Sequence, residues 1–142
     1  MSQKTKVMIF GTFDNLHAGH EFFIKEAKKL GDQVIAVVAR DLTVKQIKKK
    51  EPEISEKKRL NALKNHPLID KAILGEKSDK FKVILKHKPD ILALGYDQFV
   101  FTFLLPKFLI KNKLNIEIKR IDPYNPQIFK SSVLRAKKEQ NA

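Results

Sequence analysis

The residues best suited to chemistry lie near the amino terminus, in the segment GTFDNLHAGH that begins at Gly11. His17 and His20 are three residues apart, so on a helical turn their imidazoles point the same way. Gly11 and Gly19 let phosphates approach the backbone closely. Donors directed at a triphosphate stabilise charge on the α-phosphate and on departing pyrophosphate, while an acceptor's own phosphate oxygen attacks. The segment therefore predicts nucleotidyl transfer to a phosphate-bearing acceptor.

A histidine can also have a purely structural role, as a helix cap or as a satisfied core residue. For the isolated His66 and His87 we favour that structural interpretation. For His17 and His20, a pair around a glycine directly after GTFD, we favour the catalytic one.

The segment has to be positioned between a strand and a helix. Residues 7–10 are a short apolar run that ends at Gly11, which is typical of a buried strand. Residues 18–30 carry apolar side chains at helical spacing, and Gly31 provides a stop. In an open parallel sheet, ligands bind beyond the carboxyl ends of the strands, where a helix N-terminus presents N–H groups to anions. The position therefore predicts a phosphate site.

Strands and helices alternate along the rest of the chain. Further strands are predicted at residues 33–39, 72–74, 91–94 and 115–121, and helices at 55–64, 78–87, 99–112 and 131–138, with a lysine-rich loop at 45–50. The alternation implies crossover connections, so we expect an α/β fold: a Rossmann-like, open, five-stranded parallel sheet with helices on both faces. A length of 142 residues suits a single nucleotidyltransferase domain spanning residues 1–142.

The amino-acid composition excludes several kinds of site and partner. The chain has no cysteine, which excludes disulfides, thiolate zinc sites and a cysteine nucleophile. No apolar run is long enough for a membrane span and no signal peptide is recognisable, so a cytoplasmic protein without a membrane partner is expected. The formal charge of +13 is spread along the chain with only four arginines, and it is mostly a solvated lysine surface. Attraction for phosphorylated substrates is favoured over nucleic-acid binding.

GTFDNLHAGH resembles the signature of the HxGH nucleotidyltransferases, the cytidylyltransferase-like superfamily. The resemblance continues through GDQVIAVVARDLTVKQIKKKEP and KPDILALGYDQ and ends at KSSVLR, so it covers nearly the whole chain. It implies that His17 and His20 contact the nucleotide phosphates and stabilise the transition state. It also implies that Thr12 and Phe13 line the triphosphate site.

Three further positions carry over from the same resemblance, each with a structural alternative. Asp14 is the acid of GTFD and is expected to orient the acceptor or to cap the loop. Lys48 is expected to contact phosphate as a third catalytic residue, although a solvated charge run explains its lysine neighbours equally well. Arg59 is expected to reach the acceptor's phosphate or to form a surface ion pair.

The carboxyl-terminal half adds candidate nucleotide contacts. Gly95 and Asp97 belong to GYDQ, which follows a strand and opens into the same cleft, so Asp97 is expected at the base or ribose. Ser131 and Ser132 resemble the motif that holds the β- and γ-phosphates, although helix capping also explains them. Mg²⁺ is expected to arrive with the triphosphate. The absence of clustered carboxylates predicts no metal ligands from the protein.

Within the superfamily, GYDQ and ARDLTVKQIK resemble the archaeal FAD synthases, which transfer AMP from ATP to FMN. Glycerol-3-phosphate cytidylyltransferase, which uses CTP, is the first alternative, although its RTxGISTT signature is reduced here to FKSSVLR. The archaeal FAD synthases carry C-terminal cysteines that this chain lacks. A non-catalytic nucleotide- or nucleic-acid-binding domain is the alternative from another class. The phenylalanine-rich segment at 99–108 is either a homodimer face or core.

Overall fold

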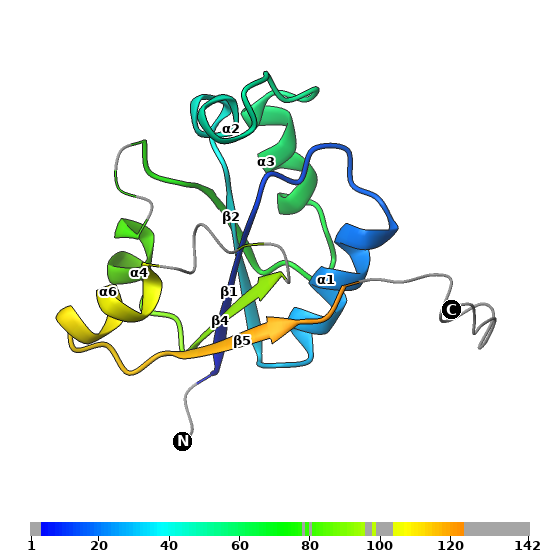
Figure 1. Cartoon of the computed structure of the whole chain (residues 1–142). Coiled ribbons are helices and arrows are strands. Elements are labelled where there is room, and N and C mark those ends of the chain that lie inside the picture. The colour runs from blue at the N-terminus through cyan, green and yellow to red at the C-terminus, as the bar shows by residue number, and fades with distance from the viewer. Residues whose placement is uncertain (1–3, 78, 80, 96–97, 99–103, 124–142) are drawn as a thin grey trace, which may run out of the picture.

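The computed structural model describes residues 4–77, 79, 81–95, 98 and 104–123, and its centre is a parallel sheet (Figure 1). The five strands are β1 (Lys6–Gly11), β2 (Gln33–Val38), β3 (Lys71–Leu74), β4 (Ile91–Gly95) and β5 (Glu117–Ile121). They follow the order β3-β2-β1-β4-β5, and every neighbouring pair is parallel. The order reverses at β1, so the loop after β1 opens at the switch point where such sheets bind ligands.

Helices cover both faces of the sheet, as the sequence predicted. They are α1 (Ala18–Lys28), α2 (Asp41–Lys48), α3 (Glu56–Lys64), α4 (Lys82–His87) and α6 (Leu105–Lys111). In Figure 1, α4 and α6 lie together on one side of the strands and α1 on the other. No helix in the described part of the chain combines the length and apolar character needed to cross a bilayer.

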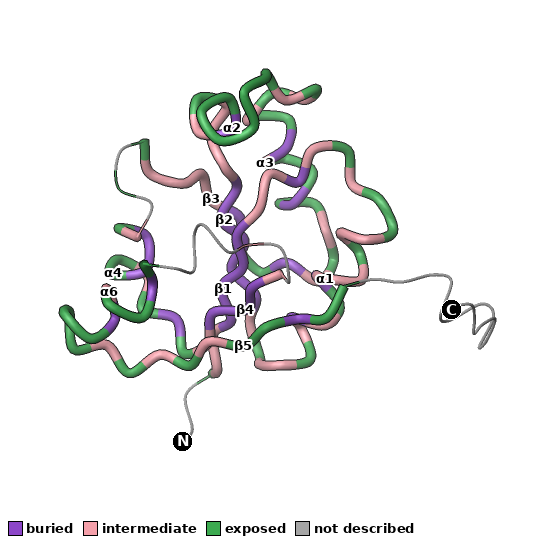
Figure 2. Tube along the Cα trace, viewed as in Figure 1, coloured by how far each residue is buried: buried purple, intermediate pink, exposed green. Residues whose placement is uncertain are grey.

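The two faces of the sheet form two separate cores, because successive side chains of a strand point to opposite faces. Val7 and Ile9 of β1 join a cluster that also contains Ile24 of α1 and Leu63 of α3. Met8 and Phe10 of β1 join a second cluster with residues of α4 and α6. Every central residue of β1 is therefore buried, on one face or the other, as the purple tube at the centre of Figure 2 shows.

Three predicted elements differ from the structure. The predicted lysine loop at 45–50 is wrong for residues 45–48, because these form the last turn of α2, and the chain leaves the helix at Lys49 with φ 63°. In the described part of the predicted helix at 99–112, α6 covers Leu105–Lys111, with Leu104 and Asn112 as its caps and Pro106 in the first turn, where proline is tolerated. The helix predicted at 78–87 is shortened to α4.

Other predictions fall outside the described residues. They are the helix at 131–138, residues 99–103 of the phenylalanine-rich segment, and the site residues Asp97, Ser131 and Ser132. In the described end of the phenylalanine-rich segment, Leu105 is buried and the ring of Phe108 packs 4.8 Å from that of Phe81 between centroids, whereas Leu104 is 57% exposed.

Candidate active site

A cleft of about 910 Å³ opens at the carboxyl edge of the sheet. The loop after β1, the start of α1, α2, and the segments that follow β3, β4 and β5 all contribute to its wall. Among the predicted site residues, those that line it are Gly11, Thr12, Phe13, Asp14, His17, Gly19, His20, Lys48 and Gly95. Arg59 is not among them. The cleft volume is within the range of small-molecule sites.

His17 and His20 face each other at the beginning of α1. Their ring centroids are 3.9 Å apart. Nδ1 of His17 accepts a hydrogen bond from the Gly19 backbone N–H at 3.0 Å, and Nδ1 of His20 accepts one from the His17 N–H at 3.2 Å. The pair thus forms a reciprocal cap for the helix. The cap uses Nδ1 of each ring and not Nε2, so a capping histidine can still offer its second nitrogen to a ligand.

The caps determine where each imidazole keeps its proton. A ring nitrogen that accepts from a backbone N–H carries no hydrogen, so in the neutral rings the proton is on Nε2. Burial, helped by the charges of His17 and Lys48, lowers the pKa of His20 below its usual value, although Glu21 and Asp14 oppose this shift. His20 is therefore a neutral Nε2–H donor at neutral pH.

Two residues of the loop between β1 and α1 have positive φ angles, which are uncommon for residues other than glycine. Phe13 has φ 55° and Asn15 has φ 57°, both in the left-handed region. Such a conformation costs about 1–2 kcal/mol for a residue with a side chain. Burial of the Phe13 ring, which is only 3% exposed, offsets this cost. A Cβ on Gly11 would lie 2.9 Å from that ring, so Gly11 makes room for Phe13.

Gly19 has a similar role next to His17. A Cβ at Gly19 would lie 2.9 Å from Cε1 and 3.2 Å from Nδ1 of the His17 ring. The missing side chain therefore lets the imidazole fold back over the first turn of α1 and cap it.

Asp14 anchors the catalytic loop to the segment before α3. Its two carboxylate oxygens accept hydrogen bonds from the backbone N–H groups of Glu53 and Ile54, each at 2.8 Å. Burial alone would raise the pKa of Asp14, but these bonds and the charges of Arg59 and Lys48 outweigh it, so the pKa is lowered. The geometry supports the loop-capping interpretation of Asp14.

Arg59 corrects both predictions made for it. It neither faces an acceptor nor forms a surface ion pair: its side chain is 0% exposed. Its guanidinium donates to the carbonyl oxygens of Ile54, Thr12 and Ala39 at 2.7–2.8 Å and pairs with Asp41 at 2.7 Å. Because its donors bind four protein oxygens from different segments, Arg59 links the loop after β1, the end of β2, the start of α2 and the segment before α3.

Lys48 lies in the last turn of α2 and is exposed to the cleft. Its charge contributes to the lowered pKa values of both His20 and Asp14, which places its ammonium within electrostatic range of the histidine pair. The predicted assignment of Lys48 to phosphate is compatible with this position.

Gln98 is a cleft residue that sequence reasoning did not select. Its amide donates to the Phe10 carbonyl oxygen at 2.9 Å and accepts from the Gly95 N–H at 2.8 Å. It thereby ties the end of β4 to β1, and no local motif marks this bond because 88 residues separate its partners.

Ten other lining residues that were not predicted lie at two ends of the cleft. Beyond β2 and β3 lie Arg40, Thr43, Ile47, Gly75 and Glu76. Near α1 and the end of β5 lie Phe22, Phe23, Ile121, Asp122 and Pro123. In the sequence, Phe22 and Phe23 belong to a helical apolar pattern, which gave no sign that they line a cleft. Arg40 could have been identified as a cleft residue from its position soon after β2.

Comparison with known proteins agrees with this geometry. A family model described as cytidylyltransferase-like matches residues 8–136. The chain belongs to the cytidylyltransferase-like family. Curated relatives of this family member include the FAD synthase of Thermoplasma volcanium, 41% identical over 132 residues, which covers 93% of this chain and 92% of the relative. The FAD synthase of Archaeoglobus profundus is 46% identical over 116 residues, 82% of this chain and 74% of the relative.

A solved structure supports the fold of this family member. The protein, from Thermoplasma volcanium, is described as a lipopolysaccharide core biosynthesis protein. It is 40% identical, covers 87% of this chain and 100% of its own, and superimposes with a TM-score of 0.81. The predicted Rossmann-like parallel sheet and the predicted resemblance to archaeal FAD synthases are both confirmed.

Proposed function

We propose that this protein is an FMN adenylyltransferase, which converts ATP and FMN into FAD and pyrophosphate. The observation that carries the proposal is the histidine pair, whose Nδ1 atoms cap α1 while both Nε2 atoms remain available as donors at the switch point of the sheet. The FAD synthase relatives support the choice of nucleotide and acceptor, since they align over most of this chain.

In this reaction an FMN phosphate oxygen attacks the α-phosphorus of ATP, and the bond from that phosphorus to the bridging oxygen of the β-phosphate breaks. Pyrophosphate leaves with the electron pair of that bond. His17 and His20 donate Nε2–H hydrogen bonds to oxygens where negative charge grows, and Lys48 adds a positive charge nearby. Because hydrogen bonds through Nδ1 hold the two imidazoles in place before the reaction, these donors stabilise the transition state without reorganising.

The other candidate site residues are assigned to binding the phosphates, to binding the base or ribose, or to positioning the loop after β1. The resemblance assigns the β- and γ-phosphates to Ser131 and Ser132 and the base or ribose to Asp97, and we retain these assignments as proposals. Thr12 and Gly95 line the cleft at the carboxyl ends of β1 and β4, where a triphosphate lies in such sheets. Asp14 and Arg59 position the loop and do not touch substrate.

We propose that Mg²⁺ binds with the nucleotide. Among the described residues, no group of three or more histidine, aspartate or glutamate side chains could hold a metal ion, and both Asp14 oxygens already accept backbone hydrogen bonds. The triphosphate and water would therefore supply most Mg²⁺ ligands. When bound, the ion neutralises phosphate charge.

We assign the FMN ring to the end of the cleft beyond β2 and β3. The histidines lie beside β1, so a nucleotide over β4 and β5 leaves the opposite end for the acceptor. There, Ile47 of α2 lines the cleft although 59% of its surface is exposed. An exposed isoleucine in a concave wall offers an apolar contact of the kind that an isoalloxazine ring requires.

Pyrophosphate release tests the proposal directly. Purified protein with Mg²⁺ is given ATP or CTP, each with FMN, glycerol 3-phosphate or a sugar phosphate. Release with ATP and FMN, accompanied by FAD in the product mixture, is the expected result. Release with CTP and glycerol 3-phosphate would replace the proposal with the cytidylyltransferase alternative, and no release from any pair would contradict both.

A further inference from the structure

A second hollow, which we call the basic hollow, lies at the opposite edge of the sheet from the active-site cleft. It encloses about 290 Å³ and is lined by Lys6, Gln33, Ile35, Asp70, Lys71 and His87. Lys6, Gln33 and Lys71 are the first residues of β1, β2 and β3, so the hollow is at the amino ends of these strands. It shares no lining residue with the cleft.

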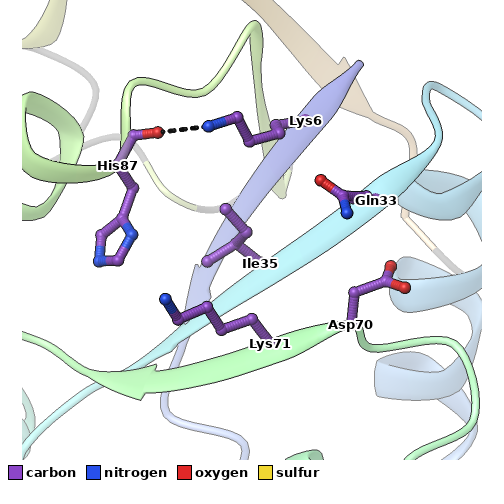
Figure 3. A pocket seen from close by; sticks show the side chains of 6 residues that line it. All are labelled: Lys6, Gln33, Ile35, Asp70, Lys71 and His87. Carbon is purple, nitrogen blue, oxygen red and sulfur yellow. Dashed lines mark hydrogen bonds between the residues drawn. The ribbon is translucent and has the colours of Figure 1, made fainter. Parts of the chain in front are cut away.

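Hydrogen-bond donors from three elements, β1, β3 and α4, line the basic hollow. Figure 3 shows the ammonium of Lys71 and the imidazole of His87 on the same side, with the buried Ile35 between them and the strands. Lys6 reaches across from β1 and donates to the His87 carbonyl oxygen at 3.1 Å. Lys6 thereby fixes the end of α4 against the sheet and keeps a positive charge at the rim of the hollow.

The nearby carboxylates are occupied elsewhere. Asp70 accepts from the Val34 N–H at 2.8 Å and pairs with Lys28 at 3.2 Å, outside the hollow. Asp90 accepts from the Lys6 backbone N–H at 2.8 Å. Within the described part of the chain, no carboxylate lies within the 4.0 Å ion-pair distance of the ammonium groups of Lys71 or Lys86. Among the lining residues, the two lysines face one carboxylate, Asp70, whose charge is paired with Lys28, so the hollow keeps a net positive charge.

We propose that the basic hollow binds a small phosphate-bearing anion. The ammonium of Lys71 and the imidazole of His87 donate to its oxygens, and Gln33 offers an amide donor from the neighbouring strand. A volume of about 290 Å³ fits a phosphate or pyrophosphate group, whereas a polynucleotide requires an extended groove. The proposal does not depend on the proposed adenylyl transfer.

The lowered pKa of His87 agrees with a positively charged hollow. Burial, followed by the charges of Lys71, Lys86 and Lys6, lowers the pKa of His87. These lysines come from β3, from α4 itself and from β1, while Asp70 is the carboxylate that also lines the hollow. An anion seated among these lysines offsets their repulsion, so binding is expected to raise the pKa of His87.

Nuclear magnetic resonance can observe this site separately from the active site, because the chain has four histidines and only His87 lines the hollow. Inorganic phosphate is titrated into the full chain at pH 7.5, with sodium chloride keeping ionic strength constant. The imidazole Cε1–H signal of His87, assigned with His87→Gln, is expected to shift and saturate. Lys71→Gln should weaken this binding about tenfold, the scale for one hydrogen bond to a charged group.

Lys57→Gln is the matched control, since it removes an equal charge from an exposed position on α3 and should leave the His87 titration unchanged. A His87 signal that stays still while those of His17 and His20 move would overturn the proposal. So would an equal response in Lys71→Gln. A single-stranded oligonucleotide that shifts His87 at far lower concentration than phosphate would reassign the hollow to a polynucleotide and also overturn it.

Discussion

The guanidinium of Arg59 donates to the carbonyl oxygen of Thr12 across 2.8 Å, which joins α3 to the loop that follows β1. The same group holds Ala39 at the end of β2 and Asp41 at the start of α2. One buried cation therefore connects the loop before the histidine pair with the helix that carries Lys48. Arg59 therefore fixes the position of the loop after β1 relative to α2.

Replacement of Arg59 by methionine should destabilise the protein by about 3–5 kcal/mol, because it leaves Asp41 and three carbonyl oxygens without their donor. Urea unfolding measures the loss. Lys58→Met on the exposed face of the same helix is the control and should change the free energy of unfolding by less than about 0.5 kcal/mol. An Arg59→Met protein as stable as the wild type would contradict the proposed stabilising role of Arg59.

The two functions of the histidines can be separated by asparagine. His17→Asn or His20→Asn keeps an acceptor at the position of Nδ1 but removes Nε2–H, so we expect near-normal stability and a turnover lower by about a hundredfold. The alanine variants lose the cap as well and should be about 1 kcal/mol less stable. Thermal unfolding and pyrophosphate release measure the two effects. Normal turnover in both asparagine variants would exclude Nε2 as a catalytic donor.

Gly19→Ala should reduce turnover without unfolding the protein. The new Cβ would meet the His17 ring at 2.9 Å, so the imidazole must move away from the nucleotide side of α1. Alanine favours the helix by about 1 kcal/mol over glycine, which offsets the loss of the cap. Gly31→Ala gives the contrasting result: its Cβ would meet the backbone oxygen of Thr5 at 2.9 Å, far from the cleft, so stability falls and turnover per folded molecule does not.

The dependence of stability on pH should report the state of His20. Its folded pKa is lowered from 6.5, so below pH 6.5 the unfolded chain takes up the proton more readily than the folded one. The contribution of His20 is therefore complete above pH 6.5 and is lost as pH falls toward the folded pKa. Urea unfolding between pH 8 and 5 should show a smaller decline for His20→Asn than for the wild type. Parallel declines would show that the folded pKa of His20 is not lowered.

Local patterns were sufficient for the five strands and the histidine pair, but not for α2, whose last turn was predicted as a loop. Alternation of apolar runs predicted the sheet, and the spacing of His17 and His20 predicted that their rings meet. The roles of Arg59 and Gln98 could not be predicted, since each depends on oxygens brought close by folding: Thr12 is 47 residues from Arg59, and Phe10 is 88 from Gln98. An arginine on a polar helix gives no sign that its guanidinium is buried.

The placement of the FMN ring is tested by two exposed residues on one helix. Ile47 and Leu42 of α2 are 59% and 55% exposed, but only Ile47 lines the cleft. Ile47→Asp should raise the KM for FMN about tenfold, because it removes an apolar contact and adds a charge that ring binding must desolvate. The KM for ATP should stay unchanged, and Leu42→Asp should alter neither constant. Direct FMN binding, followed by flavin fluorescence, gives the same comparison without turnover. Equal FMN affinity in the two variants would move the ring away from α2.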